Sequence, residues 1–451
     1  MGYAQDRLLF DTRFDASRPH AIVYCESAED VQKTVRWARK HGVRIVPRCG
    51  GHSYAGYSTT NGVVVDVTRM KRVRTRSDGS AVIGAGALLI DVYAQLAAKG
   101  VTIPAGSCPS VGIAGLSLGG GASYSGRKFG LTCDNVLGLT IVTPQGKLLQ
   151  CSAHEHPDLY WACRGGGGGN FGIVTSFRFR THAVDDVAYY QVVWPWANAA
   201  DAVRAWQAFA PHAPDELFST LFMASTAAKG PGTSPVISSG GQFFGTQAEL
   251  SALIAPLAST GAPKHVTVGT LGYMDAVMRW AGCGGTLAQC HRADRSSGGT
   301  IPRLTFKGKS DYVNAPLSDA AISTLLAGLE ANQLDRALGP AELLFDPYGG
   351  AINRVPAAAT AFVHRNALFS IQYFSSWTGS GAAANLSWIR SLYAAMRPFV
   401  SGFAYQNYID PDLAGWKHAY YGSNLRRLVA VKRKYDPRSF LRFAQSIPPR
   451  L

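Results

Sequence analysis

The sequence lacks a long hydrophobic run, because no stretch approaches the roughly 18 uninterrupted apolar residues that a membrane-spanning helix needs. We therefore expect a soluble protein with no membrane partner. Charged residues are also sparse, at 16% of the 451 residues, whereas hydrophobic residues make up 47%. This balance excludes an intrinsically disordered chain. The length exceeds that of one ordinary core, so we expect two domains of α/β or α+β type.

Acidic side chains are in short supply, since 29 Asp and Glu stand against 44 Lys and Arg and leave a formal charge of +15. Such an excess suits nucleic acid, an anionic surface or an anionic ligand. The densest basic runs, residues 69–76 and 426–438, lack the interleaved aromatic side chains of a nucleic-acid-binding surface. We interpret them as solvated faces, expect no nucleic-acid partner, and predict that part of the charge guides an anionic cofactor.

The eight cysteines are too few and too scattered for a disulfide scaffold. Cys283 and Cys290 flank a short Gly-rich loop that has neither His nor a second Cys pair at metal-ligand spacing, so we predict no metal site there. We interpret the two as a local disulfide, with two free thiols as the alternative. A disulfide favours a secreted or extracytoplasmic protein over a cytoplasmic one. The first ten residues lack the pattern of a signal peptide, so this end leaves the compartment open.

Local patterns predict a β/α succession in the first part of the chain. Ser27 is a candidate N-cap and Gly42 a stop signal for a helix over residues 28–42. Further predicted elements are strands at 43–46, 63–67, 81–83, 139–142 and 173–180 and a helix at 89–99.

After about residue 184 the pattern changes to alternating β-branched and aromatic runs, with Ala-rich helices such as residues 320–331 between them. An antiparallel sheet with helices on one face produces that pattern. We therefore predict a first domain over residues 1–183, a second over 184–396, and a final segment, 397–451, that packs back on the first.

The first domain carries three Gly-rich loops, at Gly50, Gly115–Gly121 and Gly165–Gly169. Each Gly costs conformational entropy, so this number indicates that backbone N–H groups approach a ligand closely. A pyrophosphate suits such nests of donors. None of the loops has the phosphate-loop lysine, and none fits the dinucleotide fingerprint with its acidic partner. The loops therefore predict a nucleotide held by another fold.

Six segments carry a resemblance to a known family: RCGGHSYAGYS, CPSVGIAGLSLGGG, RKFGLTCDNV, WACRGGGGGNFGIVTSF, NYIDPDL and YYGSNLRRLVAVKRKYDP. Together, and over nearly the whole chain, they resemble the berberine-bridge-enzyme-like branch of the vanillyl-alcohol-oxidase flavoprotein superfamily, in its bacterial, bicovalent type. The resemblance implies a two-domain α+β fold, with an FAD-binding α/β domain and a substrate domain whose antiparallel sheet is covered by helices.

The resemblance also implies covalent FAD. In that branch the His of the GGH motif binds the 8α-methyl group of the flavin and the Cys of the CPxVG motif binds C6; the matching residues are His52 and Cys108. A neutral imidazole nitrogen or a thiolate is a competent nucleophile for such bonds. The resemblance assigns further FAD contacts to Arg48, Cys49, Gly50, Gly51, Ser53, Tyr54, Gly112, Gly115, Gly119, Gly120, Gly172, Ile173, Tyr408, Tyr421 and Asn424.

Catalytic roles follow from the same resemblance. The residue three after the linking Cys lies where oxygen must approach the flavin, and the valine found here, Val111, goes with oxidase behaviour; a valine chosen only for packing is the alternative. Carbohydrate oxidases of the branch point to Tyr408 as a base of lowered pKa that takes the substrate hydroxyl proton. Asp346 and Gln372 look like its supporting pair, and Tyr54 like another pocket residue.

One position departs from the sugar-oxidising relatives. Where some of them have a tyrosine directly after the GGG, this chain has Ala122, and Tyr124 is displaced by two residues. This departure argues against two tyrosines that act together as the base.

Two enzymatic functions remain open. The first is an FAD-dependent oxidase of a hydroxyl or hemiacetal carbon on a sugar, oligosaccharide or related alcohol, with oxygen reduced to hydrogen peroxide. The second is an oxidase or oxidative cyclase acting on an amine, a phenol or another secondary metabolite. We expect a small-molecule or oligosaccharide substrate, molecular oxygen as the second partner, and a monomer. The substrate itself carries no sequence motif, because pocket shape rather than fold sets specificity.

Overall fold

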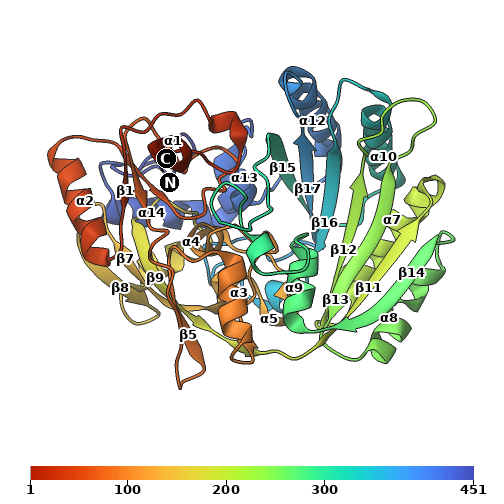
Figure 1. The fold of residues 1–451 in the computed structure, drawn as a ribbon, viewed down its shortest axis with the longest axis horizontal. Coiled ribbons are helices and arrows are strands. Elements are labelled where there is room, and N and C mark those ends of the chain that lie inside the picture. The colour runs from red at the N-terminus through yellow and green to blue at the C-terminus, as the bar shows by residue number, and fades with distance from the viewer. Residues whose placement is uncertain (1) are drawn as a thin grey trace.

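The computed structural model describes residues 2–451, and its strands form four sheets (Figure 1). Residues before 184 build three of them: a parallel sheet of order β1-β3-β2, an antiparallel sheet of order β4-β5-β9-β7-β8, and the pair β6-β10. The strands are β1 (Ala21–Tyr24), β2 (Ile45–Arg48), β3 (Val63–Asp66), β4 (Val73–Thr75), β5 (Ser80–Gly84), β6 (Val101–Thr102), β7 (Val136–Val142), β8 (Leu148–Ser152), β9 (Ile173–Arg180) and β10 (His182–Ala183).

Helix α2 (Ala28–Lys40) illustrates how local sequence signals set an element's bounds. The Ser27 hydroxyl accepts the backbone N–H of Asp30, and the Asp30 carboxylate accepts the backbone N–H of Ser27, which makes a capping box. Gly42 adopts a left-handed φ of +66° just beyond the last turn. The helix predicted over residues 28–42 is confirmed.

Strand β2 lies two residues later than the strand predicted at 43–46. It spans Ile45–Arg48 because it pairs in parallel with β3, where Ile45 lies opposite Val63. Pairing with a distant strand, which no local pattern encodes, sets these bounds. The shift places the first Gly-rich loop directly at the carboxyl end of β2.

The fourth sheet has seven antiparallel strands in the order β14-β11-β13-β12-β16-β17-β15. Helices α7, α8, α10 and α12 cover one of its faces, as predicted (Figure 1). The elements are β11 (Val187–Trp194), β12 (Leu217–Ala224), β13 (Val236–Phe243), β14 (His265–Leu271), β15 (Phe306–Val313), β16 (Ala341–Pro347), β17 (Phe369–Ser376), α7 (Ala199–Phe209), α8 (Gln247–Ser259), α10 (Asp319–Leu334) and α12 (Ala382–Met396).

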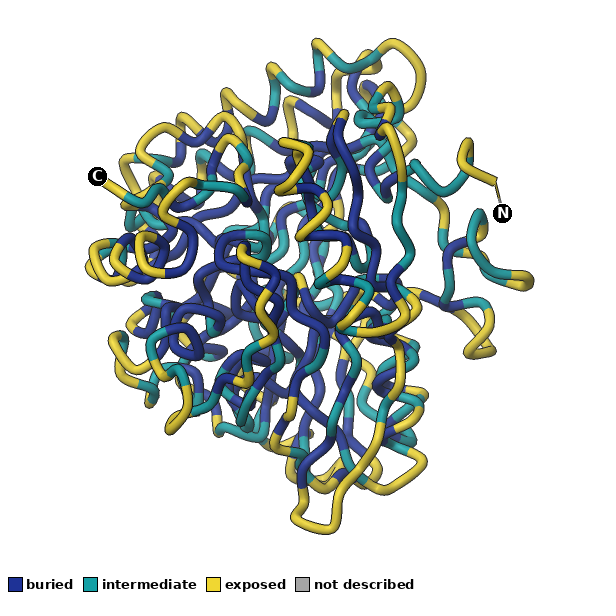
Figure 2. The backbone as a smooth tube through the Cα atoms, turned by 90° about the vertical axis from the view of Figure 1, so that its left-hand side faces the viewer, coloured by how far each residue is buried: buried dark blue, intermediate teal, exposed yellow. Residues whose placement is uncertain are grey.

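The two faces of this sheet differ in character because side chains alternate along each strand. On the helix-covered face the Trp206 indole N–H donates to the backbone carbonyl of Ser219, and the Trp206 ring packs edge-on against Phe345. The opposite face carries Thr220 and Asp346, which point toward the first three sheets. Figure 2 shows buried chain running through the middle of the molecule between outer, exposed turns.

The chain's last segment packs against the first part of the molecule. In α14 (Leu425–Tyr435) the Lys432 ammonium donates to the backbone carbonyl of Asn170 at 2.6 Å and to the Asp436 carboxylate at 2.7 Å. Asn170 ends the run of five glycines, so this buried lysine ties that loop to the carboxyl end of the chain. The domain boundaries at 183 and 396 remain a proposal.

The remaining α-helices are short, and one precedes a disulfide. Cys283 and Cys290 are bonded to each other shortly after α9, which confirms the predicted disulfide. Among residues 2–451, no helix has the length and apolar character needed to cross a bilayer. These helices are α1 (Tyr3–Asp6), α3 (Leu89–Ala97), α4 (Ile113–Gly119), α5 (Gly126–Phe129), α6 (Pro157–Ala162), α9 (Tyr273–Trp280), α11 (Gly350–Arg354) and α13 (Trp416–Tyr421).

Candidate active site

Two loops that carry predicted cofactor residues are packed backbone to backbone. A Cβ atom on Gly50 would lie 2.5 Å from the amide nitrogen of Gly112 and 2.8 Å from the carbonyl oxygen of Ser110. A Cβ atom on Gly112 would lie 2.1 Å from the sulfur of Cys49. Only glycine permits this approach at either position. The contact brings the His52 loop and the Cys108 loop, which are distant in sequence, to one place.

His52 is held in a defined orientation and in its neutral form. Its Nε2 shares a hydrogen bond of 2.9 Å with the Ser110 hydroxyl, and its ring stacks on Phe10 with centroids 4.1 Å apart. Burial lowers the pKa of His52 to about 3. Within residues 2–451, Nδ1 makes no hydrogen bond. The ring is therefore a neutral imidazole with one free nitrogen.

Cys108 is exposed, although protein atoms surround it on most sides. The sulfur is therefore accessible from outside the protein. Burial and then the negative charge of Asp346 raise the pKa of the Cys108 thiol. The sulfur is therefore a thiol at neutral pH. A proton acceptor is needed to convert it to the thiolate, which is the nucleophile required for a covalent bond to the flavin.

Three predicted pocket residues come together beside these loops. The Gln372 amide donates to the Tyr54 hydroxyl at 2.7 Å. The rings of Tyr54 and Tyr408 stack with centroids 5.2 Å apart. Tyr408 lies in a short 3₁₀ helix, η7 (Gln406–Tyr408), which follows the seven-stranded sheet in sequence.

The lowered pKa expected for Tyr408 is wrong. Its pKa lies well above the usual value, chiefly because the ring is buried, and the neighbouring acidic groups Tyr54, Asp346, Tyr405 and Cys108 act in the same direction. No sequence pattern gave the number of ionisable neighbours around this ring. Tyr408 is therefore a protonated phenol and a hydrogen-bond donor at neutral pH.

Asp346 and Gln372 share the uncovered face of the seven-stranded sheet. Gln372 lies opposite Leu344, and Asp346 follows two residues after Leu344 on β16. Burial raises the pKa of Asp346 to about 7, and it also raises the pKa of Glu342 on the same face. Neither carboxyl has a hydrogen-bond or ion-pair partner among residues 2–451. Two unpartnered carboxyls thus flank Leu344, and Glu342 was not expected from the sequence.

Val111 lies on the same turn as Cys108. Its amide donates to the carbonyl of Cys108 at 3.3 Å, and its own carbonyl accepts the amide of Leu89 at 2.9 Å. The half-buried side chain is thereby fixed next to the exposed thiol. Its predicted part in oxygen access remains a proposal.

Gly119 sets the position of the Tyr408 segment. A Cβ atom there would lie 1.9 Å from the side-chain oxygen of Asn407 and 2.3 Å from that of Gln406. The Asn407 amide also donates to the carbonyl of Leu116 in α4 at 2.9 Å. The second Gly-rich stretch therefore serves first to bring α4 against η7.

A buried ion cluster fixes the other side of this segment. Asp410 pairs with Lys307 and with Lys309, the latter at 2.5 Å, and all three side chains are nearly inaccessible to solvent. Its carbonyl accepts the amide of Gln445 at 2.7 Å. The cluster joins β15 to the chain just after Tyr408.

Arg48 and two glycines test whether the loops fit FAD. The Arg48 Nε donates to Asp66 at 2.6 Å, but its two terminal nitrogens are buried and lack a partner among residues 2–451. A Cβ atom on Gly115 would meet nothing within 4 Å, and one on Gly168 would touch atoms only at 3.9 Å. Buried guanidinium donors without a partner and open backbone at glycines both suit an anionic pyrophosphate, so the residues fit the cofactor.

Several other predicted cofactor residues have partners inside the protein. The Tyr421 hydroxyl donates to the carbonyl of Gly166 at 3.2 Å. The Asn424 amide donates to the carbonyl of Ala357 at 2.7 Å. The remaining predicted cofactor residues also have local structural roles. Gly51 and Gly120 adopt positive φ angles of +72° and +138°. The Ser53 hydroxyl accepts the backbone N–H of Tyr57, Gly172 packs against Ile141, and Ile173 is buried.

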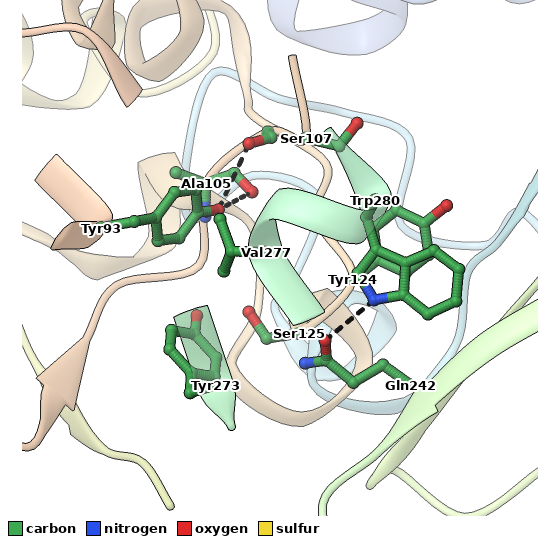
Figure 3. A pocket seen from close by; sticks show the side chains of 10 residues that line it. Tyr93, Ala105, Ser107, Tyr124, Ser125, Gln242, Tyr273, Val277 and Trp280 are labelled. Atoms are coloured by element: carbon green, nitrogen blue, oxygen red, sulfur yellow. Dashed lines mark hydrogen bonds between the residues drawn. The ribbon is translucent and has the colours of Figure 1, made fainter. Parts of the chain in front are cut away.

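An aromatic pair that lines a cavity beside the site was not predicted from the sequence. Tyr124 and Trp280 stack with centroids 4.6 Å apart, and the Trp280 indole donates to the Gln242 side chain at 3.1 Å (Figure 3). The sequence identified Tyr124 only as a tyrosine displaced from its position in some relatives, and no sequence motif contains Trp280. The stack is available only once α9 lies over the sheet.

Known proteins resemble this chain over almost its whole length. Residues 19–152 match the family described as FAD binding domain, and residues 404–448 match Berberine and berberine like. The FAD-linked oxidoreductase YgaK of Bacillus subtilis (strain 168) is 36% identical over 96% of this chain and 91% of its own length. Berberine bridge enzyme-like 4 of Arabidopsis thaliana is 32% identical over 95% of this chain and 84% of its own.

Solved structures agree. BBE-like 1 of Physcomitrella patens is 35% identical, with a TM-score of 0.89 over 100% of this chain and 95% of that one. A chitooligosaccharide oxidase is 27% identical, with a TM-score of 0.86 over 100% and 96%. The chain therefore belongs to the berberine-bridge-enzyme-like family of FAD-dependent oxidoreductases, within the vanillyl-alcohol-oxidase superfamily.

Proposed function

We propose that this enzyme oxidises a hydroxyl or hemiacetal carbon of a sugar, an oligosaccharide or a related alcohol, with oxygen as the acceptor and hydrogen peroxide as the product. One observation carries the proposal: Tyr54, Tyr408, Gln372 and Asp346 converge beside the exposed Cys108 thiol. Bound FAD would supply the acceptance of two electrons from the substrate and their delivery to oxygen.

We further propose that His52 and Cys108 hold the cofactor covalently. The free Nδ1 of the neutral His52 ring is the nitrogen available for one bond, because Nε2 is engaged by Ser110. The exposed sulfur of Cys108 is available for the other. Arg48 and the open backbone at Gly115 would hold the pyrophosphate.

Proton removal from the substrate falls to Tyr408 and Asp346 together. A general base works best when its pKa lies near the operating pH, and Asp346, at about 7, meets this condition. Tyr408 donates rather than accepts while it is protonated. In this proposal bound substrate completes a hydrogen-bonded chain with Tyr408 and Asp346, in which the Tyr408 hydroxyl takes the substrate proton as its own passes to Asp346, so the proton finally resides on the carboxylate.

Hydroxyl-rich substrates suit the polar groups of the pocket. The Tyr54 hydroxyl and the Gln372 amide present neutral donors and acceptors, and the Trp280 ring offers the flat apolar surface on which a sugar ring can lie. The chitooligosaccharide oxidase to which the chain is similar supports the same class.

An amine substrate is the second candidate, and one observation favours it. Asp346 and Glu342 are two unpartnered carboxyls in a chain of net charge +15, and an ammonium group would pair with them. A phenolic or other secondary metabolite falls under the same alternative.

A peroxide assay on a panel of sugars, alcohols and amines tests the proposal. Peroxide from reducing oligosaccharides, with none from amines, is the expected result. The Asp346→Asn variant should lose the activity. Release only with amines would reverse the order of the two candidates, and no release with any substrate would reject an oxidase.

The location is also a proposal. The Cys283–Cys290 disulfide supports a secreted or extracytoplasmic enzyme, since such bonds persist in oxidising compartments. We propose a monomer, which size-exclusion chromatography with light scattering would check.

A further inference from the structure

A cavity of about 400 Å³ opens on the uncovered face of the seven-stranded sheet. Its floor comes from four neighbouring strands, which contribute Gln191, Thr220, Ser238 and Leu344. Adjacent strands lie roughly 4.8 Å apart, so the floor spans about 14 Å. Side chains of α9 form its wall.

The cavity adjoins the strand that carries the proposed catalytic carboxyl, Asp346. Leu344, on its floor, lies between the two unpartnered carboxyls, Glu342 and Asp346. Tyr124 lines the cavity, and burial first and then the neighbouring carboxyl of Asp346 raise the pKa of its phenol, so the ring lies near that carboxyl. A substrate that is oxidised at the end of the cavity nearest Glu342 and Asp346 would therefore extend over the floor toward α9.

The α9 end of the cavity has the opposite charge. Arg279 lines it, and it is exposed and forms no ion pair with any of residues 2–451. Its guanidinium lies 4.6 Å from the centre of the Tyr189 ring and donates to the Gln191 side chain at 3.3 Å. These two contacts hold the charged group at the cavity while its charge stays unneutralised.

Trp280, next to Arg279, completes a platform at this end. Its ring stacks on Tyr124 at an angle of 8° and is fixed by the bond to Gln242 (Figure 3). A flat, immobilised aromatic surface suits the apolar face of a sugar ring. A sugar ring on it would carry its substituents within reach of Arg279.

We propose that the cavity binds the second ring of an acidic oligosaccharide, and that Arg279 recognises a carboxylate on that ring. The substrate class is a uronic-acid-containing glycoside whose reducing end is oxidised beside Asp346. A guanidinium matches a planar carboxylate through two parallel hydrogen bonds, which a neutral hydroxymethyl group cannot form. This inference rests on the proposed oxidation of sugars.

Two disaccharides that differ only in this group test it: cellobiose and cellobiouronic acid, whose second ring carries a carboxylate in place of the hydroxymethyl group. Peroxide release gives kcat and KM for both with the holoenzyme. Their methyl glycosides, which have a blocked anomeric carbon, give binding constants by calorimetry without turnover at that carbon. We expect the acidic member of each pair to bind about 10-fold more tightly, since hydrogen bonds to charged groups are the stronger kind.

The variants Arg279→Gln and Arg279→Lys separate charge from geometry. Gln should bring the acidic-to-neutral ratio close to one, and Lys should keep only part of the preference. Arg204→Gln is the matched control, because Arg204 is an exposed arginine of α7 on the helix-covered side of the sheet and its loss changes the net charge equally. The preference should also weaken as salt is raised.

The outcomes separate this inference from the proposed function. If cellobiose is oxidised while the acidic and neutral glycosides bind equally, or while Arg279→Gln keeps the full preference, the acidic subsite is overturned and the sugar oxidase stands. If the acidic glycoside binds through Arg279 but neither sugar yields peroxide, the subsite stands and the proposed reaction fails. If neither glycoside binds, the acidic subsite is rejected, and peroxide release from the sugar panel alone decides the proposed reaction.

Discussion

The rings of Tyr54 and Tyr408 stack with centroids 5.2 Å apart and planes inclined by 16°. Tyr54 follows β2, whereas Tyr408 belongs to the last segment of the chain, so the stack joins segments that are far apart in sequence. The Gln372 amide, on the seven-stranded sheet, donates to the Tyr54 hydroxyl. The proposed proton-transfer site is therefore built from all three parts of the molecule.

Replacing Tyr408 by Phe should slow the reductive half-reaction. The ring and its stack on Tyr54 remain, while the hydroxyl that carries the proton is lost. Loss of a general acid–base group costs typically about 10²–10⁴-fold. Anaerobic stopped-flow absorbance should show slow flavin reduction by substrate, with reoxidation by air close to normal. If reduction is as fast as in the wild type, the substrate proton goes elsewhere, and Asp346 or Tyr54 becomes the leading base.

The pH dependence should follow Asp346. Its carboxyl is ionised above the pKa of about 7 and protonated below it, so the rate of flavin reduction should rise as the pH increases through about 7. In the Asp346→Asn variant the rate of flavin reduction should no longer rise as the pH increases through about 7. A profile that is flat between pH 6 and 8 in the wild type would argue against Asp346 as the final proton acceptor.

Stability gives a second readout of the same carboxyl. Its pKa is raised on folding above the usual value of 3.8, so its contribution to stability is full below that value and is lost as the pH rises through about 7. The melting temperature of Asp346→Asn, relative to that of the wild type, should therefore increase between pH 5 and pH 8. An unchanged difference would show that the folded-state pKa is not raised.

Covalent attachment predicts a pattern across three variants. His52→Ala and Cys108→Ala should each keep the flavin through acid precipitation, because one bond remains, whereas the double variant should release it. In-gel fluorescence and intact mass measure this directly. Free FAD in the supernatant of the acid-precipitated wild type would refute both bonds.

Val111→Ile should slow reoxidation alone. The added methylene lies on the turn that holds Cys108, where oxygen is proposed to approach, and the substrate residues are untouched. Stopped-flow mixing of the reduced enzyme with oxygen should give a lower rate, with anaerobic reduction unchanged. Val111→Leu is a useful comparison of similar bulk without β-branching. Equal reoxidation rates would place the oxygen path elsewhere.

Peptide mapping without reductant should find Cys283 and Cys290 linked in enzyme from its native host. The disulfide closes a short loop. Its reduction should lower the stability of that loop by about 2–4 kcal/mol, and faster hydrogen exchange of the loop amides would measure this loss. Two thiols that can be alkylated in the native protein would remove the support for an extracytoplasmic location.

The sequence was informative wherever one local signal decides the structure. The capping residue Ser27 and the stop at Gly42 predicted α2, and the alternating runs predicted an antiparallel sheet with one covered face. The family motifs predicted which residues gather around Cys108. The structure adds the reason that they can gather, which is the contact of Gly50 with Gly112.

Properties that depend on distant neighbours could not be predicted. The pKa of Tyr408 was expected to be low, but it is set by burial and by acidic groups from three other segments. Arg279 and Trp280 belong to a helix without a motif, and their importance arises only because α9 lies over the sheet beside Tyr124. The unpartnered Glu342 is likewise visible only on the folded sheet.

The buried cluster of Asp410 with Lys307 and Lys309 has a consequence for the route by which substrate enters and product leaves. To swing the Tyr408 segment outward, the protein would have to separate buried ionic partners, and breaking such a pair costs about 3–5 kcal/mol. That side of the pocket is therefore a fixed back wall. In the proposed binding mode, substrate enters and product leaves on the opposite side, past Trp280 and Arg279, so the residues proposed to select the substrate would also be the first it meets.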